Sequence, residues 1–406
     1  MFSNQTKRAA LKGVITKNSP FYIQFYISKN CHQKCGMCNI VEANSDVTPF
    51  ANSQIEKIAD NLKKIGAGVI LLTGGEPFMR PDIADIVKIF KSRNLDVRSQ
   101  TAGLVSKKDR VKHAMENGLR DISVSVDSLD EKKSDWINGL DNSWANAIEM
   151  ISFISRTYPS NEGICSLGAV LSKHNINEIL PLVDFASEIG WWLSLVPVHS
   201  AAGDDAQLNF RGRKDSMFNT KIRRDYGYDF HENDYDDIRN LISVLKERKR
   251  SGSLIFDSDK FLDSVEVFLT TGHPNWRKNG VCDSPNLYFA ILPDGKFAPC
   301  CDFRHSEDIY VYDDNFPQIF NSKAFKKDVK DIVKECPGCN YGSFPVITLF
   351  ARSFSALTEK ISVVRKTESK GMIPLEEEEM FNIIKKIKNN YPDIYPIDHS
   401  SGYYNF

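Results

Sequence analysis

The stretch Lys29-Asn-Cys31-His-Gln-Lys-Cys35-Gly-Met-Cys38-Asn-Ile-Val41 decides the fold, because it places three cysteines directly after an apolar, strand-like run at 21–27. Three thiolates at this spacing can converge on one soft metal centre, and thiolates select zinc, copper(I) or iron–sulfur clusters. A structural zinc site needs a fourth ligand close by, and its cysteines usually come as two closely spaced pairs. A set of three leaves one coordination position open for a substrate or cofactor. Spacing alone therefore favours a cluster, with a zinc or structural site as the alternative.

A second motif, Thr73-Gly74-Gly75-Glu76-Pro77, ends the next apolar run, which begins at residue 68. Two glycines after a strand allow a ligand to approach the backbone closely. The carboxylate that follows them can accept hydrogen bonds from an amine. A Gly-Gly pair alone is typical of any tight turn. It indicates a ligand site here because it follows the cysteine set by one predicted strand.

Together the two motifs resemble those of the radical SAM superfamily, in which the cysteine loop follows the first barrel strand and a Gly-Gly-Glu-Pro motif ends the second. The resemblance implies that Cys31, Cys35 and Cys38 bind three irons of a 4Fe–4S cluster. It also implies that the amino and carboxylate groups of S-adenosylmethionine (SAM) chelate the fourth iron. The implied contacts to the methionyl amine come from Gly74, Gly75 and Glu76, with Thr73 and Pro77 as their neighbours in the motif.

One position departs from the pattern of the superfamily. The residue before the last cysteine, usually aromatic, is Met37. The contact to adenine at this place is apolar and partly made by backbone, so an adaptable thioether side chain should serve.

Composition indicates a globular protein with a sizeable core. The chain has 406 residues, of which 41% are hydrophobic and 26% charged, and its net charge is −1. A near-neutral chain has no basic field for nucleic acid or membranes. The start, 1–20, has no apolar segment typical of a signal peptide, and no apolar run is long enough to span a bilayer. We therefore expect a cytoplasmic protein whose nine cysteines are reduced or bind metal rather than forming disulfides.

From residue 21 to residue 197, short apolar runs alternate with amphipathic ones. The predicted strands are 21–28, 68–73, 95–101, 120–126, 163–171 and 191–197, and the predicted helices are 53–66, 81–93, 106–117, 143–157 and 176–189. Strands buried on both faces and joined by helices are typical of parallel sheets with right-handed crossovers. The pattern predicts an α/β fold with a partial (β/α)6 barrel of the TIM type, which agrees with the resembled superfamily.

A barrel of this kind binds ligands at the carboxyl ends of its strands. The resemblance implies polar contacts to SAM from the ends of the third and fourth strands, where Thr101, Ser125 and Asp127 stand, and Val196 lies at the end of the sixth. A serine or aspartate at a strand end can instead cap the next helix. His199 follows the sixth strand and is the candidate general base, with a structural histidine as the alternative; Asp204, Asp205 and Asp302 are further candidates.

A second cysteine group lies in the C-terminal third of the chain. Cys282 and Cys300 flank a predicted β-hairpin with a turn at Asp294-Gly295, which brings them to one end. A predicted helix at 322–334 then leads to Cys336-Pro-Gly-Cys339. Four thiolates form a closed site that, by geometry alone, suits zinc or iron–sulfur equally.

The spacing of this second group resembles the twitch domain, a shortened relative of the SPASM domain, which binds one auxiliary 4Fe–4S cluster. The resemblance implies Cys282, Cys300, Cys336 and Cys339 as ligands, with the adjoining Cys301 a spare or alternative one. The predicted organisation is an N-terminal extension (1–20), the barrel (21–199), a loop and helical connector (200–275), a small α+β auxiliary-cluster domain (276–345) and a helical tail (346–406) whose helix is opened by Pro374.

The resemblance implies an enzyme in which SAM is cleaved reductively to a 5′-deoxyadenosyl radical that takes a hydrogen atom from a substrate. The implied electron donor is a flavodoxin or ferredoxin. The substrate is either a small molecule of the sugar, aminocyclitol or nucleoside type, oxidised or rearranged, or a ribosomal peptide that is crosslinked or oxidised. Peptide maturases often carry an N-terminal recognition module, and only about 20 residues precede the predicted barrel, which favours the small molecule. A zinc-binding interaction protein without catalysis is the third interpretation.

Overall fold

The computed structural model describes most of the chain. The described residues are 2–38, 40–44, 48–157, 162–198, 227–277, 282–300, 305–334, 336, 338–340 and 343–396.

An open, mainly parallel sheet forms the centre of the molecule. Its strands are β1 (Tyr22–Ser28), β2 (Val69–Gly74), β3 (Asp96–Thr101), β4 (Asp121–Ser125), β5 (Cys165–Leu171), β6 (Trp192–Pro197), β7 (Tyr288–Ile291) and β8 (Phe297–Ala298). Their order is β6-β5-β4-β3-β2-β1-β7-β8, and every neighbouring pair from β6 to β7 is parallel. The six predicted strands are all present, and the partial barrel is confirmed.

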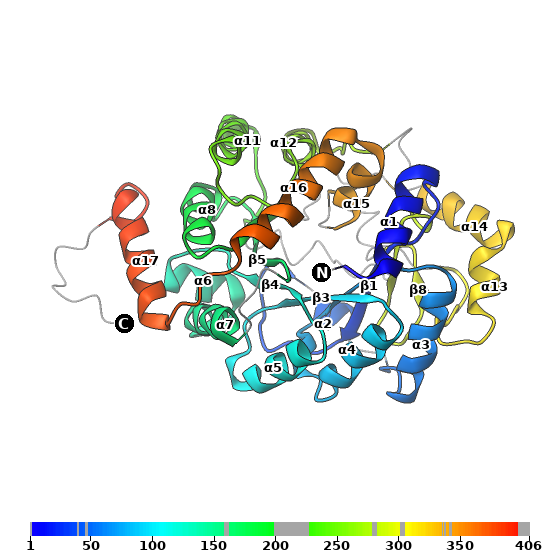
Figure 1. The fold of residues 1–406 in the computed structure, drawn as a ribbon. Coiled ribbons are helices and arrows are strands. Elements are labelled where there is room, and N and C mark those ends of the chain that lie inside the picture. Colours follow the sequence, from blue (N-terminus) through cyan, green and yellow to red (C-terminus); the bar gives the residue numbers. More distant parts are fainter. Residues whose placement is uncertain are drawn as a thin grey trace.

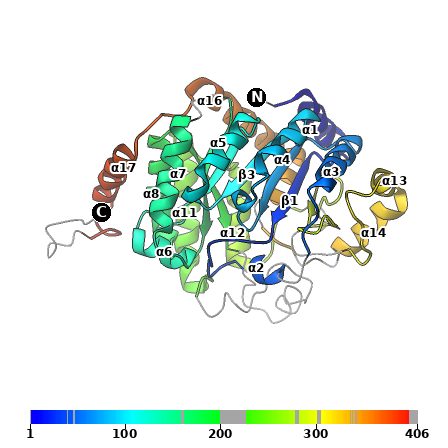
Figure 2. The ribbon, with the colours of Figure 1, turned by 90° about the horizontal axis from the view of Figure 1, so that it is seen from below.

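Helices surround this sheet (Figures 1 and 2). They are α1 (Asn4–Thr16), α2 (Ile40–Ala43), α3 (Ser53–Lys64), α4 (Ile83–Ser92), α5 (Lys108–Glu116), α6 (Glu131–Asn138), α7 (Ser143–Thr157), α8 (Ile179–Glu188), α11 (Tyr235–Arg250), α12 (Asp259–Thr271), α13 (Phe316–Asn321), α14 (Lys323–Lys334), α15 (Ser343–Arg352), α16 (Phe354–Lys370) and α17 (Glu377–Asn390). Apolar side chains of α3, α4, α5, α7 and α8 pack with the outward-facing residues of the strands in one large core. This packing holds the strand ends, and hence the site, in register.

The hairpin of the second cysteine group joins the central sheet. Its strand β7 pairs in parallel with β1, from Tyr22 opposite Tyr288 to Phe25 opposite Ile291. Only β8 is antiparallel, and it closes the hairpin against β7. An open barrel leaves unpaired backbone groups along β1, and β7 satisfies them. The two cysteine groups therefore share one continuous sheet.

Helices α1, α15 and α16 cover the inward face of the barrel. The periodicity of apolar residues does not single them out in the sequence. The residues that α1 buries are small (Thr6, Ala9 and Gly13), so it lacks the large apolar stripe that signals a helix. Ala9 packs with Ile347 of α15 against the start of β1 and β2. Figure 1 shows α1 and α16 on the near side of the barrel, on either side of the N-terminus.

The C-terminal helix starts slightly later than predicted. It begins at Glu377, three residues after Pro374, because Glu376 and Glu379 form a capping box at its start. Met380, Ile384 and Ile387 form the predicted buried stripe. In the described part of the chain, no helix is long and apolar enough to cross a membrane.

Candidate functional site

The first cysteine loop leaves the carboxyl end of β1 and is fixed by α6. The Lys34 amide donates to the carbonyl of Asn138 at 3.0 Å, and the Gly36 amide donates to that of Ile137 at 3.2 Å. Gly139, which ends α6 with φ at +58°, lies so close that a Cβ there would be 2.4 Å from the Lys34 carbonyl oxygen. The loop is thus docked on α6 through backbone contacts, and the Cys35 thiol adds a contact to Asn138 Oδ1 at 3.7 Å.

The Gly-Gly motif at the end of β2 packs directly against this loop. A Cβ on Gly74 would lie 2.3 Å from the Ser28 carbonyl oxygen, and one on Gly75 would lie 2.1 Å from that of Asn30. The Gly75 amide donates to Ser28 at 2.8 Å, and the Glu76 amide donates to Asn30 at 2.7 Å. Both glycines are therefore required for contact with the backbone of the cysteine loop itself. The two motifs that the sequence singles out form one unit.

Glu76 follows the glycines and is buried, with 1% of its surface exposed. Its carboxylate accepts hydrogen bonds from the Thr101 hydroxyl at 3.0 Å, the Ala102 amide at 2.8 Å and the Phe78 amide at 3.0 Å. Burial raises its pKa to about 7, although these donors act in the opposite direction. The side chain ties the end of β2 to the end of β3, and a cation beside it would favour its charged form.

The three N-terminal cysteines lie close enough together to influence one another. Burial, together with the charges of Glu76 and Cys38, raises the pKa of the Cys31 thiol to about 11. Burial also raises the pKa of Cys35, with added effects from Cys38, Asp127 and Cys31. Thiols held in the protonated form at neutral pH must lose their protons to solvent when they bind a metal centre.

Several other residues singled out by the sequence line the same end of the barrel. The Thr73 hydroxyl donates to Gln100 Oε1 at 3.0 Å. Asp127 is buried and accepts a hydrogen bond from the Val170 amide at 2.6 Å, and burial raises its pKa to about 7. Ser125 is exposed at the end of β4, beside Gly168 of β5. Their contacts to SAM stay predictions, as do those of Met37, Pro77, Thr101 and Val196.

The candidate general bases all lie outside the described residues. They are His199, Asp204, Asp205 and Asp302, and the alternative ligand Cys301 lies outside them as well.

The second cysteine group gathers at the far end of the β7–β8 hairpin. The Ser284 hydroxyl donates to the Pro299 carbonyl at 2.7 Å and so joins the Cys282 segment to the Cys300 segment. The Trp276 indole donates to the Cys339 carbonyl at 2.7 Å, and Arg277 donates to that of Cys336 at 3.0 Å. The segment before the hairpin therefore positions the Cys-x2-Cys turn.

The thiols of this group also influence one another. Burial, together with the nearby Cys300 and Cys339, raises the pKa of Cys282 to about 12. Burial raises the pKa of Cys336 to about 12, with added effects from Cys282 and Cys300. Each of the four thiols thus lies near at least one other, as ligands of a single centre must.

The donor set of each group fits an iron–sulfur cluster, because it consists of cysteine thiols. Tetrahedral zinc needs four ligands around one ion at about 2.0–2.3 Å. A four-iron cluster takes one cysteine per iron and so accepts thiols that stand further apart.

Comparison with known sequences agrees with this assignment. Residues 25–186 match the profile described as the radical SAM superfamily, and residues 282–340 match an iron–sulfur cluster-binding domain. The chain is 23% identical over 175 residues to an AdoMet-dependent heme synthase of Methanosarcina barkeri, covering 43% of this chain and 49% of that protein. It is 28% identical over 182 residues to a GTP 3′,8-cyclase of Aquifex aeolicus, covering 43% of this chain and 55% of that protein. The chain thus spans about half the length of these relatives.

A solved structure shares the fold over more of the chain. The crystal structure of Streptococcus suis SuiB bound to its precursor peptide SuiA superposes with a TM-score of 0.57 at 16% identity, covering 82% of this chain and 74% of that one. This likeness supports the architecture of the barrel with its C-terminal hairpin.

Proposed function

We propose that the chain is a radical SAM enzyme with a C-terminal iron–sulfur cluster-binding domain, and that it oxidises or rearranges a small organic molecule after hydrogen-atom abstraction. The observation that carries the proposal is the docking of Gly74 and Gly75 on the backbone of the Cys31–Cys38 loop. This contact assembles cluster ligands and amine-binding residues at one end of the barrel, the end at which such folds bind ligands.

The first site takes a 4Fe–4S cluster on Cys31, Cys35 and Cys38, with SAM on the open iron. When bound, this pair supplies the radical chemistry, since the cofactor carries the difficult step. The protein orients it. Glu76 presents a buried carboxylate whose geometry is fixed by Thr101 and Ala102, so the N–H groups of a methionyl amine beside it would donate to a charged acceptor without any rearrangement.

The second site takes an auxiliary 4Fe–4S cluster on Cys282, Cys300, Cys336 and Cys339. Because β7 and β1 are neighbours in one sheet, the two sites are connected by a rigid element. We assign the second cluster to electron transfer during substrate oxidation, with an electron relay or a structural role as alternatives.

Peptide maturation is the second candidate function. It is supported by the shared fold with SuiB, whose structure was solved with a precursor peptide bound. Either reaction requires an external reductant, and a flavodoxin or ferredoxin fits that role. We place the reaction in the cytoplasm, because the chemistry requires cysteines that stay reduced.

The test is an iron count and a SAM-cleavage assay on anaerobically reconstituted protein. Wild type should hold about eight irons and release 5′-deoxyadenosine, and a Cys31/Cys35/Cys38→Ala variant should hold about four and release none. A Cys336/Cys339→Ala variant should also hold about four irons yet still cleave SAM. If wild type holds only about four irons, all lost in the first variant, the second cluster is wrong. If it holds none, the whole proposal fails.

A further inference from the structure

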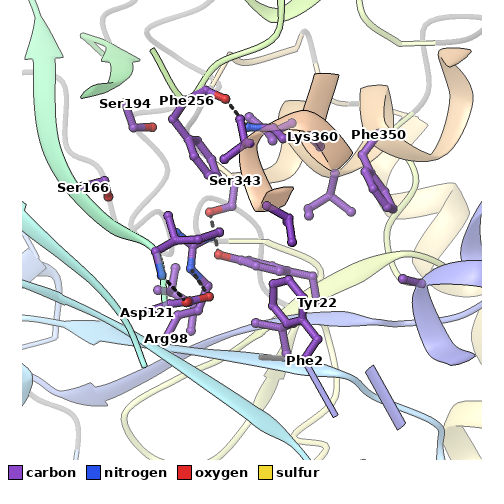
Figure 3. A pocket seen from close by; sticks show the side chains of 18 of the residues that line it. Phe2, Tyr22, Arg98, Asp121, Ser166, Ser194, Phe256, Ser343, Phe350 and Lys360 are labelled. Atoms are coloured by element: carbon purple, nitrogen blue, oxygen red, sulfur yellow. Dashed lines mark hydrogen bonds and ion pairs between the residues drawn. The ribbon is translucent and has the colours of Figure 1, made fainter. Parts of the chain in front are cut away.

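A cavity of about 690 Å³ occupies the barrel interior beneath the predicted SAM site. It lies between the inward face of the sheet and helices α1, α15 and α16, and Figure 3 shows its wall from close by. Its volume is in the range of small-molecule sites, about 300–1,000 Å³.

Small side chains on three neighbouring strands leave this space open. Ser123 of β4, Ser166 and Gly168 of β5, and Ser194 of β6 all line the cavity. Residues two apart on a strand share a face, so these positions mark the inward surface of the sheet. Barrels of this type usually fill the interior with large branched side chains, and here they are replaced by hydroxymethyl groups or hydrogen.

The opposite wall of the cavity is apolar and continues to the surface. Phe2, Val346 and Phe350 line it from the N-terminal segment and α15. Leu11 of α1 and Ile361 of α16 also line it, yet 61% and 41% of their surfaces are exposed. Exposed apolar residues at the edge of a cavity are typical of a ligand-binding site. We place the entrance between α1 and α16.

The charged side chains that line the cavity are mainly basic. The lining contains four basic residues and two acidic ones, namely Lys7, Arg98, Lys360 and Arg365, and Asp121 and Glu368.

Arg98 and Lys360 are the half-buried ones among the four basic residues, and both lie near the Phe256 ring. The Arg98 guanidinium carbon is 5.5 Å from the ring centroid, and the Lys360 ammonium nitrogen is 3.2 Å from it. The Lys360 ammonium also donates to the Phe256 carbonyl at 2.7 Å.

Arg98 has donors to spare. Its Nε is 3.7 Å from Asp121 Oδ2, which is beyond hydrogen-bond distance, and it makes no hydrogen bond with the residues that the structure describes. A guanidinium offers five N–H donors in a fork that matches a carboxylate. Because the ion pair with Asp121 leaves N–H donors of Arg98 open among the described residues, the mainly apolar cavity around it favours an anionic ligand group.

The cavity reaches the predicted SAM site from below. Gln100, at its upper edge, accepts the hydrogen bond from Thr73, the residue before the Gly-Gly pair. Gly168, also at the upper edge, lies opposite Ser125. A ligand in the cavity would thus contact the strand residues directly beneath those expected to hold SAM.

We propose that this cavity is the substrate pocket and that the substrate is an amphipathic carboxylic acid, with its carboxylate at Arg98 and its apolar body along α1, α15 and α16. This rests on the proposed function and narrows it, since a mainly apolar wall suits such an acid better than a sugar, aminocyclitol or nucleoside. Without Arg98 the carboxylate of the substrate would lose a charge-assisted bidentate contact. Burial of the apolar body would still favour binding as long as the pocket is open.

Calorimetric titration of the reconstituted protein with decanoate tests the proposal, with decyltrimethylammonium as the probe of opposite charge. Decanoate should bind wild type, and Arg98→Gln should weaken binding at least tenfold, as expected for a hydrogen bond to a charged group worth about 1.5–3 kcal/mol. Arg93→Gln is the matched control, because both arginine side chains are 21% exposed and Arg93 lies on the outer surface. Ser166→Phe should fill the pocket and abolish binding while Arg98 remains.

Each outcome separates this inference from the proposed function. Equal binding of the cationic probe, or unchanged binding in Ser166→Phe with iron content and melting temperature intact, overturns the pocket assignment. If wild type cleaves SAM but does not bind decanoate, the substrate class is wrong and the proposed function stands. If decanoate binds but no SAM is cleaved, the pocket stands and the proposed function fails.

Discussion

The carboxylate of Glu76 and the hydroxyl of Thr101 are joined by a hydrogen bond of 3.0 Å to each carboxylate oxygen. This contact links the ends of β2 and β3 beside the first cysteine loop. It also fixes an anionic group whose pKa burial raises to about 7. The protonation of Glu76 therefore changes in the pH range in which the enzyme would work.

SAM affinity should depend on pH through Glu76. The carboxyl group of Glu76 can accept the N–H groups of the amine on both oxygens only when it is ionised, and a group with its pKa near 7 is mostly protonated at pH 6 and mostly ionised at pH 8. Affinity should therefore rise about tenfold between these values. Equilibrium dialysis against SAM measures it.

The matched variants are Glu76→Gln and Asp127→Asn, because burial raises the pKa of both carboxyls to about 7. The pH dependence should disappear in Glu76→Gln and persist in Asp127→Asn. The reverse result would assign the amine contact to Asp127.

Gly75→Ala should abolish assembly of the first site. The added methyl would lie 2.1 Å from the Asn30 carbonyl oxygen and 2.5 Å from its carbon, so the cysteine loop must move. Iron content should fall by about four per chain, and SAM cleavage should be lost. Gly66→Ala is the control, since no atom lies within 4 Å of its new methyl, while its φ of +83° adds a backbone strain that Gly75 does not have. Equal iron loss in both variants would show that general destabilisation, rather than the contact with Asn30, is the cause.

The sequence predicts the barrel well because period-two and period-3.6 patterns are strong where strands and helices bury large apolar residues. All six strands agree within two residues at either end. It also predicts both cysteine groups and the Gly-Gly motif, since their residue types have few other uses at that spacing.

The cavity and its cover could not be predicted, because they depend on contacts between distant segments. Helix α1 faces the sheet with small residues, and the pairing of β7 with β1 joins positions more than 250 residues apart in the chain. One signal was present: Arg98 stands inside a run predicted as a buried strand. A charged residue at such a position indicates a cavity or a functional partner, because burying a lone charge is costly.

Tyr395→Phe should loosen the C-terminal segment from the barrel. The Tyr395 hydroxyl donates to Glu178 Oε2 at 2.8 Å, and Glu178 is fully buried beside the end of β4. Removing one donor from a buried carboxylate should cost about 1–2 kcal/mol in the free energy of unfolding. Tyr391→Phe is the matched control, because its partner Asp184 is 24% exposed and water can replace the lost contact. Urea unfolding measures both; a larger loss for Tyr391→Phe would contradict the assignment.

Arg352→Lys should weaken the second cluster site while leaving the first intact. Arg352 donates to both carboxylate oxygens of Asp283, the residue after Cys282, and so ties the first cysteine of the site to α15. Lysine keeps the charge but loses the two-point fork. Asp283 is 8% exposed, so the loss is not readily compensated by water. We expect iron content to fall toward about four per chain after mild chelation, with SAM cleavage retained. Arg93→Lys, whose partner Asp60 is 50% exposed, should keep all its iron under the same treatment. If Arg352→Lys lowers only the melting temperature and keeps its iron, the pair stabilises the fold without positioning Cys282.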